Sequence, residues 1–120
     1  MLRTILFFTT LLIIPVVGAS NFNFLHQATP ISDFKKEDKK IFMETIQQAL
    51  NEKKDGERLA WQNEKTGNSG LVNPLLTLDK KDGECRNVRI INKSKKNIAE
   101  SWFKFCKTDG KWVAVEMLQK

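Results

Sequence analysis

The chain has 120 residues, which is enough for one domain and too short for two. Its formal net charge is +6 at pH 7, because 20 lysines and arginines stand against 14 acidic residues. Most of the positive charge is lysine scattered along the chain, which is typical of a solvated surface. This pattern argues against a nucleic-acid-binding face, where arginines would accompany exposed aromatic rings. The charge pattern is compatible with a weak peripheral contact with an anionic membrane surface or envelope polymer.

Residues 1–19 have the pattern of a secretory signal peptide. Arg3 provides a positive start, residues 5–17 form an apolar core, and Val17-Gly18-Ala19 offers the small residues that a signal peptidase reads. The apolar run is shorter than the roughly 20 residues that a membrane-spanning helix needs. We therefore expect cleavage after Ala19 or Ser20, with a retained anchor helix as the alternative. No cysteine stands near the cleavage site, so we expect no lipid anchor.

Residues 20–32 are predicted to be a flexible leader, because they are polar, include Pro30 and show no sustained hydrophobic period. The single histidine of the chain, His26, lies in this leader and has no partners there for a metal site or for catalysis. Residues 33–120 form the predicted domain. A domain of this size buries only about 60–65% of its unfolded surface, so a covalent crosslink would add useful stability.

The domain begins with a predicted amphipathic helix from Asp33 or Lys36 to Lys53. One face is apolar and consists of Phe42, Thr45, Ile46, Ala49 and Leu50. The opposite, solvated face carries Lys36, Lys40, Glu44, Gln47 and Gln48. We expect the apolar face to cover the sheet that follows, because the strands need a second layer. Docking of this face on a membrane or on a partner is the alternative.

After residue 57 the hydrophobic period changes to that of strands. Five strands are predicted, at about residues 58–62, 70–78, 84–91, 98–107 and 111–117. Short turns between them require an antiparallel meander. Pro74 has no N–H to donate, which predicts an edge position or a bulge in the second strand. The predicted fold class is therefore α+β, with one helix on an antiparallel sheet and one disulfide.

The disulfide is expected between Cys85 and Cys106, the two cysteines of the chain. In an oxidising compartment they should pair, with Cα atoms roughly 4.4–6.8 Å apart. A reactive thiol or a metal pair is the alternative, but it lacks a nearby histidine or further ligands. Placing Cys85 opposite Cys106 sets Val88 opposite Phe103 on the side of the helix. The disulfide and Trp102 then lie on the other side of the sheet.

The same register brings Arg89 beside Trp102 on the face away from the helix. A cation–π contact there would stabilise the sheet, and the pair becomes an interaction patch if it is exposed and contiguous with other apolar residues. Trp61 and Trp112 are expected to be packing anchors, with a role as ligand platforms as the alternative. The sequence contains no serine elbow, paired-histidine zinc motif or phosphate loop. We therefore predict no catalytic residues, no cofactor, no metal and no enzymatic activity.

The segment from Trp61 to Trp112 carries a set of motifs in a fixed order. They are Trp61-Gln-Asn63, Thr66-Gly67-Asn68-Ser-Gly70-Leu-Val72-Asn-Pro74, Gly83-Glu-Cys85-Arg86, Cys106 and Asp109-Gly110-Lys111-Trp112. This order resembles the C-terminal domain of the bacterial surface antigens of the rickettsial 17-kDa type. The resemblance implies a location in the bacterial envelope and an immunogenic surface role. It implies no catalytic residues. The chain departs from the lipidated members of that family, because it lacks their cysteine.

Two functions of different classes are predicted. The first is a secreted or envelope-associated surface antigen, located in the periplasm, at the outer membrane or at the cell surface. It has a structural role or binds another molecule, and its partner is an unidentified protein or envelope polymer. The alternative is a secreted inhibitor or binding module directed at an enzyme such as a lysozyme or a protease. An exposed aromatic patch opposite the helix would favour the inhibitor, and a featureless lysine-rich surface would favour the envelope protein.

Overall fold

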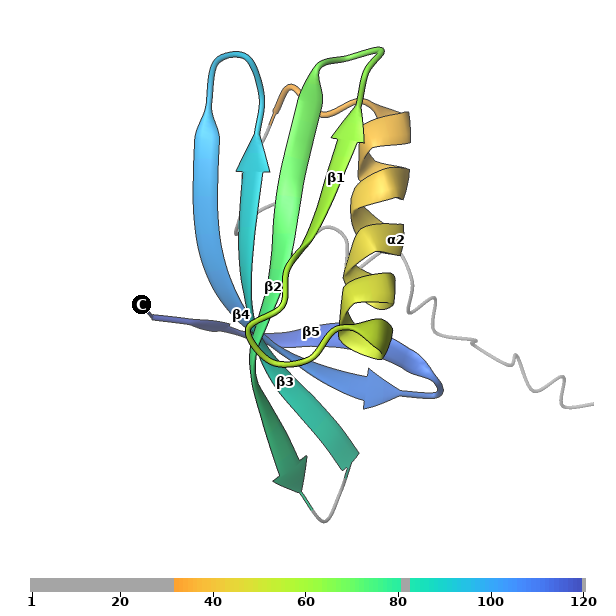
Figure 1. Cartoon of the computed structure of the whole chain (residues 1–120), viewed down its shortest axis with the longest axis vertical. Coiled ribbons are helices and arrows are strands. Elements are labelled where there is room, and N and C mark those ends of the chain that lie inside the picture. The colour runs from red at the N-terminus through yellow and green to blue at the C-terminus, as the bar shows by residue number, and fades with distance from the viewer. Residues whose placement is uncertain (1–31, 81–82, 120) are drawn as a thin grey trace, which may run out of the picture.

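A computed structural model of the chain describes residues 32–80 and 83–119. In this part of the chain one helix, α2 (Lys36–Glu52), packs on a five-stranded antiparallel sheet, as Figure 1 shows. The strands are β1 (Leu59–Asn63), β2 (Asn68–Lys80), β3 (Gly83–Lys93), β4 (Ile98–Thr108) and β5 (Lys111–Leu118). They pair in the order β1-β2-β3-β4-β5, which confirms the predicted α+β fold and meander. The predicted signal peptide and nearly all of the leader lie outside the described residues.

Helix α2 starts where a side chain holds the backbone that enters it. The carboxylate of Asp38 accepts a 2.7 Å hydrogen bond from the backbone N–H of Lys35, the residue before the helix. At the other end the N–H of Lys53 still bonds to the carbonyl of Ala49 at 2.9 Å. The buried side of α2 is the predicted apolar stripe, extended by Asp38.

Gln47 does not lie on the solvated face of α2, and this expectation was wrong. It is half-buried, and its side-chain nitrogen donates a 2.8 Å hydrogen bond to the carbonyl of Trp112. Its side-chain oxygen accepts a 2.9 Å bond from the N–H of the same residue. Strand β5 is at the edge of the sheet and pairs with β4 alone. The Gln47 amide therefore satisfies edge groups that would otherwise stay open to pairing with another chain.

The pairing of β3 with β4 follows the predicted register. Cys85 faces Cys106, Val88 faces Phe103 and Arg89 faces Trp102. The side chains on the inner face of the sheet meet the apolar face of α2 and form the core. Its buried members are Phe34, Phe42, Ile46, Ala49, Leu50, Trp61, Val72, Val88, Ile90, Phe103, Phe105, Trp112 and Ala114. The predicted sandwich of helix and sheet is thus confirmed, and Trp61 and Trp112 are packing anchors.

Strand β2 changes its surroundings at Pro74. Its pairing with β3 shifts register between Pro74 and Leu76, which is the predicted bulge. Strand β1 reaches only as far as Val72, so β2 is also an edge strand from Pro74 onward. The carbonyl of Pro74 accepts a 2.7 Å bond from the N–H of Gly56 in the loop before β1. Beyond this point β2 and β3 continue together as the hairpin at the lower end of Figure 1.

Within residues 32–80 and 83–119, no helix has both the length and the apolar character that crossing a membrane requires. The apolar face of α2 is instead turned to the sheet, where Ile46 and Ala49 are fully buried.

Candidate functional site

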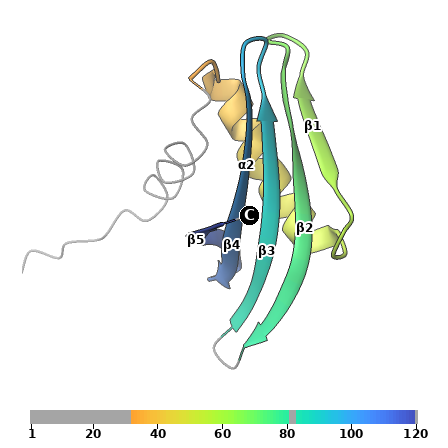
Figure 2. The same cartoon turned by 90° about the vertical axis from the view of Figure 1, so that its left-hand side faces the viewer.

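The face of the sheet that points away from α2 is called here the outer face. Figure 2 looks onto it, with α2 lying behind the strands. The strand registers place its residues in rows that cross the sheet. Four of these rows are Ala60, Leu71, Ile91 and Glu100; Asn73, Arg89, Trp102 and Leu118; Leu76, Asn87, Lys104 and Glu116; and Leu78, Cys85, Cys106 and Val113.

The outer face is more apolar than a solvated sheet face usually is. Six of its hydrophobic side chains are half-buried, namely Leu71, Leu78, Ile91, Trp102, Val113 and Leu118. Leu76 is 50% exposed. An antiparallel sheet with one solvated face normally alternates apolar-in with polar-out. A face that keeps this much apolar surface in contact with solvent is a candidate site for binding another molecule.

Arg89 and Trp102 occupy the middle of this face, as predicted from the register. The Nε atom of Arg89 lies 3.2 Å from a carboxylate oxygen of Glu100. Both side chains are about one-third exposed, at 32% and 33%, so this ion pair is a partly solvated one of modest strength. The row therefore combines an aromatic ring, a paired guanidinium and the apolar side chain of Leu118. This combination suits a partner with both apolar and polar groups.

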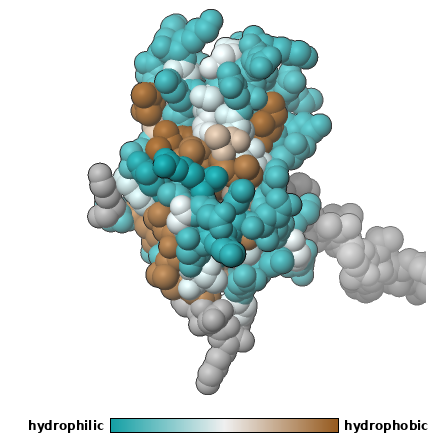
Figure 3. All heavy atoms as spheres, viewed as in Figure 1, coloured by the Kyte–Doolittle hydropathy of each residue, from teal (hydrophilic) through white to brown (hydrophobic). Residues whose placement is uncertain are grey.

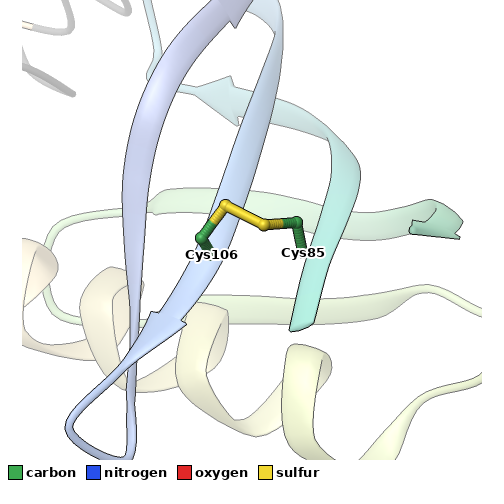
Figure 4. Close-up of a disulfide and its surroundings, with 2 residues drawn as sticks. All are labelled: Cys85 and Cys106. Carbon is green, nitrogen blue, oxygen red and sulfur yellow. A yellow bond between two sulfur atoms is a disulfide. The ribbon is translucent and has the colours of Figure 1, made fainter. Parts of the chain in front are cut away.

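The predicted disulfide between Cys85 and Cys106 is present and joins β3 to β4 on the outer face (Figure 4). The Cα atoms are 4.0 Å apart, slightly closer than the expected range. The two cysteines face each other directly across neighbouring strands. Among directly opposed residues of an antiparallel sheet are the pairs whose Cα atoms lie closest together. The bridge holds the strands that carry Arg89 and Trp102 in one register.

A buried polar cluster lies beneath the start of α2, with the carboxylate of Asp38 at its centre. Four donors converge on this carboxylate. They are Thr66 Oγ1 at 2.6 Å, Lys35 N at 2.7 Å, Asn63 Nδ2 at 2.8 Å and Asn68 Nδ2 at 2.9 Å. Burial alone would raise the pKa of Asp38, but these hydrogen bonds outweigh it and hold the pKa below its ordinary value. Asp38 is thus an ionised carboxylate that fastens the helix to the turn between β1 and β2.

A second polar cluster ties the far end of α2 to the sheet through Arg86. Its side chain is buried, and it donates to the carbonyl of Leu50 at 2.9 Å and to the carboxylate of Asp55 at 2.8 Å. The same carboxylate accepts bonds from the N–H and the hydroxyl of Thr77, on the open edge of β2. The hydrogen bond from Arg86, followed by that from Thr77, lowers the pKa of Asp55. This cluster therefore links the C-terminal end of the helix to the open edge of β2.

The sequence prediction missed both clusters, although a signal for the Asp38 cluster was present. Asp38 stands four positions before Phe42 on the apolar stripe, where a charged residue needs a partner. Its partners Asn63, Thr66 and Asn68 all belong to the Trp61–Pro74 motif. The polar part of that motif therefore has a structural use in this chain.

Gly70, in the same motif, also has a structural role. A β-carbon at this position would collide with the indole nitrogen of Trp61 and would lie 2.8 Å from the carbonyl oxygen of Ile91 and from the side-chain oxygen of Asn92. Only a glycine leaves room there for the Trp61 ring to pack across β2. The motif thus positions Trp61 in the core.

Comparisons of the chain with protein-family models, with curated proteins and with solved structures find no match. Among the described residues, no three histidine, cysteine or acidic side chains lie close enough together to hold a metal ion. The feature of the structure that could contact another molecule is the half-buried apolar outer face of the sheet.

Proposed function

We propose that this chain is an exported protein of the bacterial cell envelope, of the kind represented by the rickettsial 17-kDa surface antigens. Its role is to bind another molecule through the outer face of its sheet, without catalysis. The disulfide between Cys85 and Cys106 carries the exported location, and the half-buried apolar outer face carries the binding role, which the alternative inhibitor described below would share. The partner is a protein or an envelope polymer.

Two features support the location. The first is the disulfide, because such bonds persist in oxidising compartments and are rare in a reducing cytoplasm. The second is the signal-peptide pattern of residues 1–19, which predicts export. The two features are independent of each other, since one depends on the folded domain and the other on the N-terminal sequence.

The outer face supports a binding role more than a purely structural one. A domain that served only as a spacer would gain from polar residues on its solvated face, because exposed apolar patches promote aggregation. Here Trp102, Leu118 and Leu76 remain accessible on a sheet that the disulfide holds in register. A rigid surface loses little conformational entropy when it binds.

The experiment is fractionation of native bacterial cells followed by mass measurement of the intact protein. We expect the protein in the envelope or outside the cell, with residues 1–19 or 1–20 removed and no acyl chain attached. A cytoplasmic protein that keeps Met1 would contradict the proposed location. Reactivity of both cysteines with a thiol reagent in the freshly isolated protein would also contradict it.

The alternative of a secreted enzyme inhibitor is favoured by one observation, the accessible Trp102 on the outer face. An inhibitor would present this ring to the active site of a lysozyme or a protease. The test measures the activity of such enzymes with the unaltered protein and with a Trp102→Ala variant. Inhibition that the variant loses would support the inhibitor; equal inhibition by both proteins would exclude the outer face as the inhibitory surface.

A further inference from the structure

A lysine-lined pocket of about 290 Å³ lies at the end of the domain where α2 begins. It is lined by Asp33, Lys35, Lys65, Thr66, Asn68, Lys95 and Lys96, and it is called here the lysine pocket. These residues come from three segments: the entry to α2, the turn between β1 and β2, and the tip of the β3–β4 hairpin. Figure 1 shows these segments side by side at the upper end of the molecule, and Figure 2 shows the two turns together there. In Figure 3 this end is mostly hydrophilic.

The charges of the lysine pocket are strongly unequal. Four lysines line the pocket together with one carboxylate, that of Asp33. The ionised carboxylate of Asp38, bonded to the lining residues Thr66 and Asn68, offsets one further positive charge. The Asp33 carboxylate is engaged by a 2.8 Å hydrogen bond from the hydroxyl of Ser94. Lys65 lies 4.0 Å from Glu37, but both side chains are largely exposed, so this ion pair is weak. Such an excess of positive charge in a concave site attracts an anion.

The backbone that carries these lysines is held by buried side chains. The hydroxyl of Ser94 accepts bonds from the N–H groups of Lys96 and Asn97, which fixes the hairpin tip. The side-chain oxygen of Asn63 accepts a bond from the N–H of Lys65, which fixes the β1–β2 turn. The N–H of Lys35 is held by Asp38. The separation between the three lysine-bearing segments is therefore set before any ligand arrives, which lowers the entropic cost of binding.

Gly67 allows one of the lysines to cross the turn. A β-carbon on Gly67 would lie 3.4 Å from the Cε atom of Lys95, so the aliphatic part of that lysine passes over the glycine. This contact brings the hairpin lysine to the turn that carries Lys65. The polar residues at the base of the pocket are already committed, because Thr66 and Asn68 both donate to Asp38. The lysines thus remain as the groups that can meet an anion.

We propose that the lysine pocket binds a phosphoryl group. A phosphate ester carries up to about two negative charges and three acceptor oxygens, so it can meet ammonium groups that approach from three sides. Lysine binds phosphate as a point charge and needs no planar alignment, unlike a bidentate arginine. This inference is independent of the proposed outer-face function. The phosphoryl group can belong to a soluble phosphate or to a phospholipid headgroup.

The experiment titrates the exported form of the protein, without residues 1–19, labelled with nitrogen-15, with inorganic phosphate at constant ionic strength. We expect saturable shifts of the amide signals of residues 35, 65–68 and 94–97. A second arm measures sedimentation with phosphatidylglycerol vesicles. Saturation by phosphate alone identifies a soluble ligand, and binding to the vesicles alone identifies a headgroup. Either result supports the proposed pocket. If neither phosphate nor the vesicles bind saturably, the proposal is overturned.

Two matched variants separate the pocket from general charge attraction. The first replaces three pocket lysines, as Lys35→Gln, Lys95→Gln and Lys96→Gln. The second replaces three exposed lysines elsewhere, as Lys40→Gln, Lys54→Gln and Lys111→Gln. Both lower the net charge by three. We expect at least about tenfold weaker binding for the pocket variant and less than about twofold for the other. Equal weakening by the two variants would show that binding follows net charge, and it would overturn the proposal.

Discussion

The side-chain nitrogen of Asn68 donates a 2.9 Å hydrogen bond to the carboxylate of Asp38, and both residues are buried although they are 30 positions apart. This bond connects the first turn of α2 to the first residue of β2. With the bonds from Asn63 and Thr66, it makes the docking of the helix depend on one negative charge. Helix placement in this domain therefore has an electrostatic component in addition to apolar packing.

Asp38→Asn should lower the free energy of unfolding by about 2–3 kcal/mol at pH 7, because buried donors lose a charged acceptor. The variant amide also brings a donor to a site already filled with donors. Denaturant unfolding of the variant and the parent measures this difference. Glu37→Gln is the matched control, since Glu37 is exposed in the same turn and its loss should cost less than about 0.5 kcal/mol. Equal costs for the two changes would contradict the role of Asp38.

The same carboxylate predicts a dependence on pH. The pKa of Asp38 is lower in the folded state than its ordinary value, so the ionised form favours folding. This stability is fully present above an unfolded-state pKa of about 4, and it is lost as pH falls through the folded-state pKa. The stability difference between the parent and Asp38→Asn should therefore shrink from pH 6 towards pH 2. A stability difference that stays constant over this range would mean that the pKa of Asp38 is the same in the folded and unfolded states.

Gln47→Ala should destabilise the domain by about 1–2 kcal/mol, because the backbone N–H and carbonyl of Trp112 lose their partners at the edge of β5. Gln48→Ala is an unusually close control. Gln48 is the next residue of the same helix, is exposed, and bonds only to the exposed Glu52 among the described contacts. Its replacement should change the free energy of unfolding by less than about 0.5 kcal/mol. Thermal unfolding of both variants gives the comparison.

Replacing both cysteines by alanine should lower the free energy of unfolding by about 2–4 kcal/mol while the domain keeps its fold. The bridge closes a loop between residues 21 positions apart, and opening it frees the unfolded chain. Circular dichroism and denaturant titration measure the fold and the stability. If the double variant keeps its stability but loses binding, the cysteines have a functional duty beyond their structural one.

Gly70→Ala should destabilise the domain by at least about 2 kcal/mol, because its β-carbon meets Trp61 and the backbone of β3. Gly56→Ala provides the contrast. Gly56 has a positive φ of 88° but open space around it, so its replacement should cost only about 1 kcal/mol of backbone strain. Fluorescence of the tryptophans during unfolding reports both values. A smaller cost at Gly70 than at Gly56 would show that the ring of Trp61 can move aside.

The β3–β4 register could be predicted because short turns and an alternating pattern leave few ways to place Cys85 opposite Cys106. The bulge at Pro74 follows from the missing N–H of proline, which is a local property. Contacts between the helix and the sheet were harder to predict from the sequence. Gln47 lies on the polar side of the helical period, and only the path of β5 past the helix brings it to Trp112.

The lysine pocket could not be predicted for a related reason. Lys35, Lys65 and Lys95 look like scattered surface charges when the sequence is read alone. The meander brings their three segments to one end of the sheet, and that placement depends on strand lengths that a hydrophobic pattern gives only to within a few residues. Asp38 was different, because a charged residue within an apolar stripe is visible in the sequence.

The disulfide also makes the chain between its two cysteines a covalent ring. That ring contains the exposed tip of the β3–β4 hairpin, with Lys95 and Lys96. A protease such as trypsin that cut after either lysine would open the ring without releasing a fragment, because Cys85 and Cys106 would still join the two pieces. The nicked protein would migrate as one species until a reductant was added, and the lysine-rich tip can be cleaved without dividing the domain.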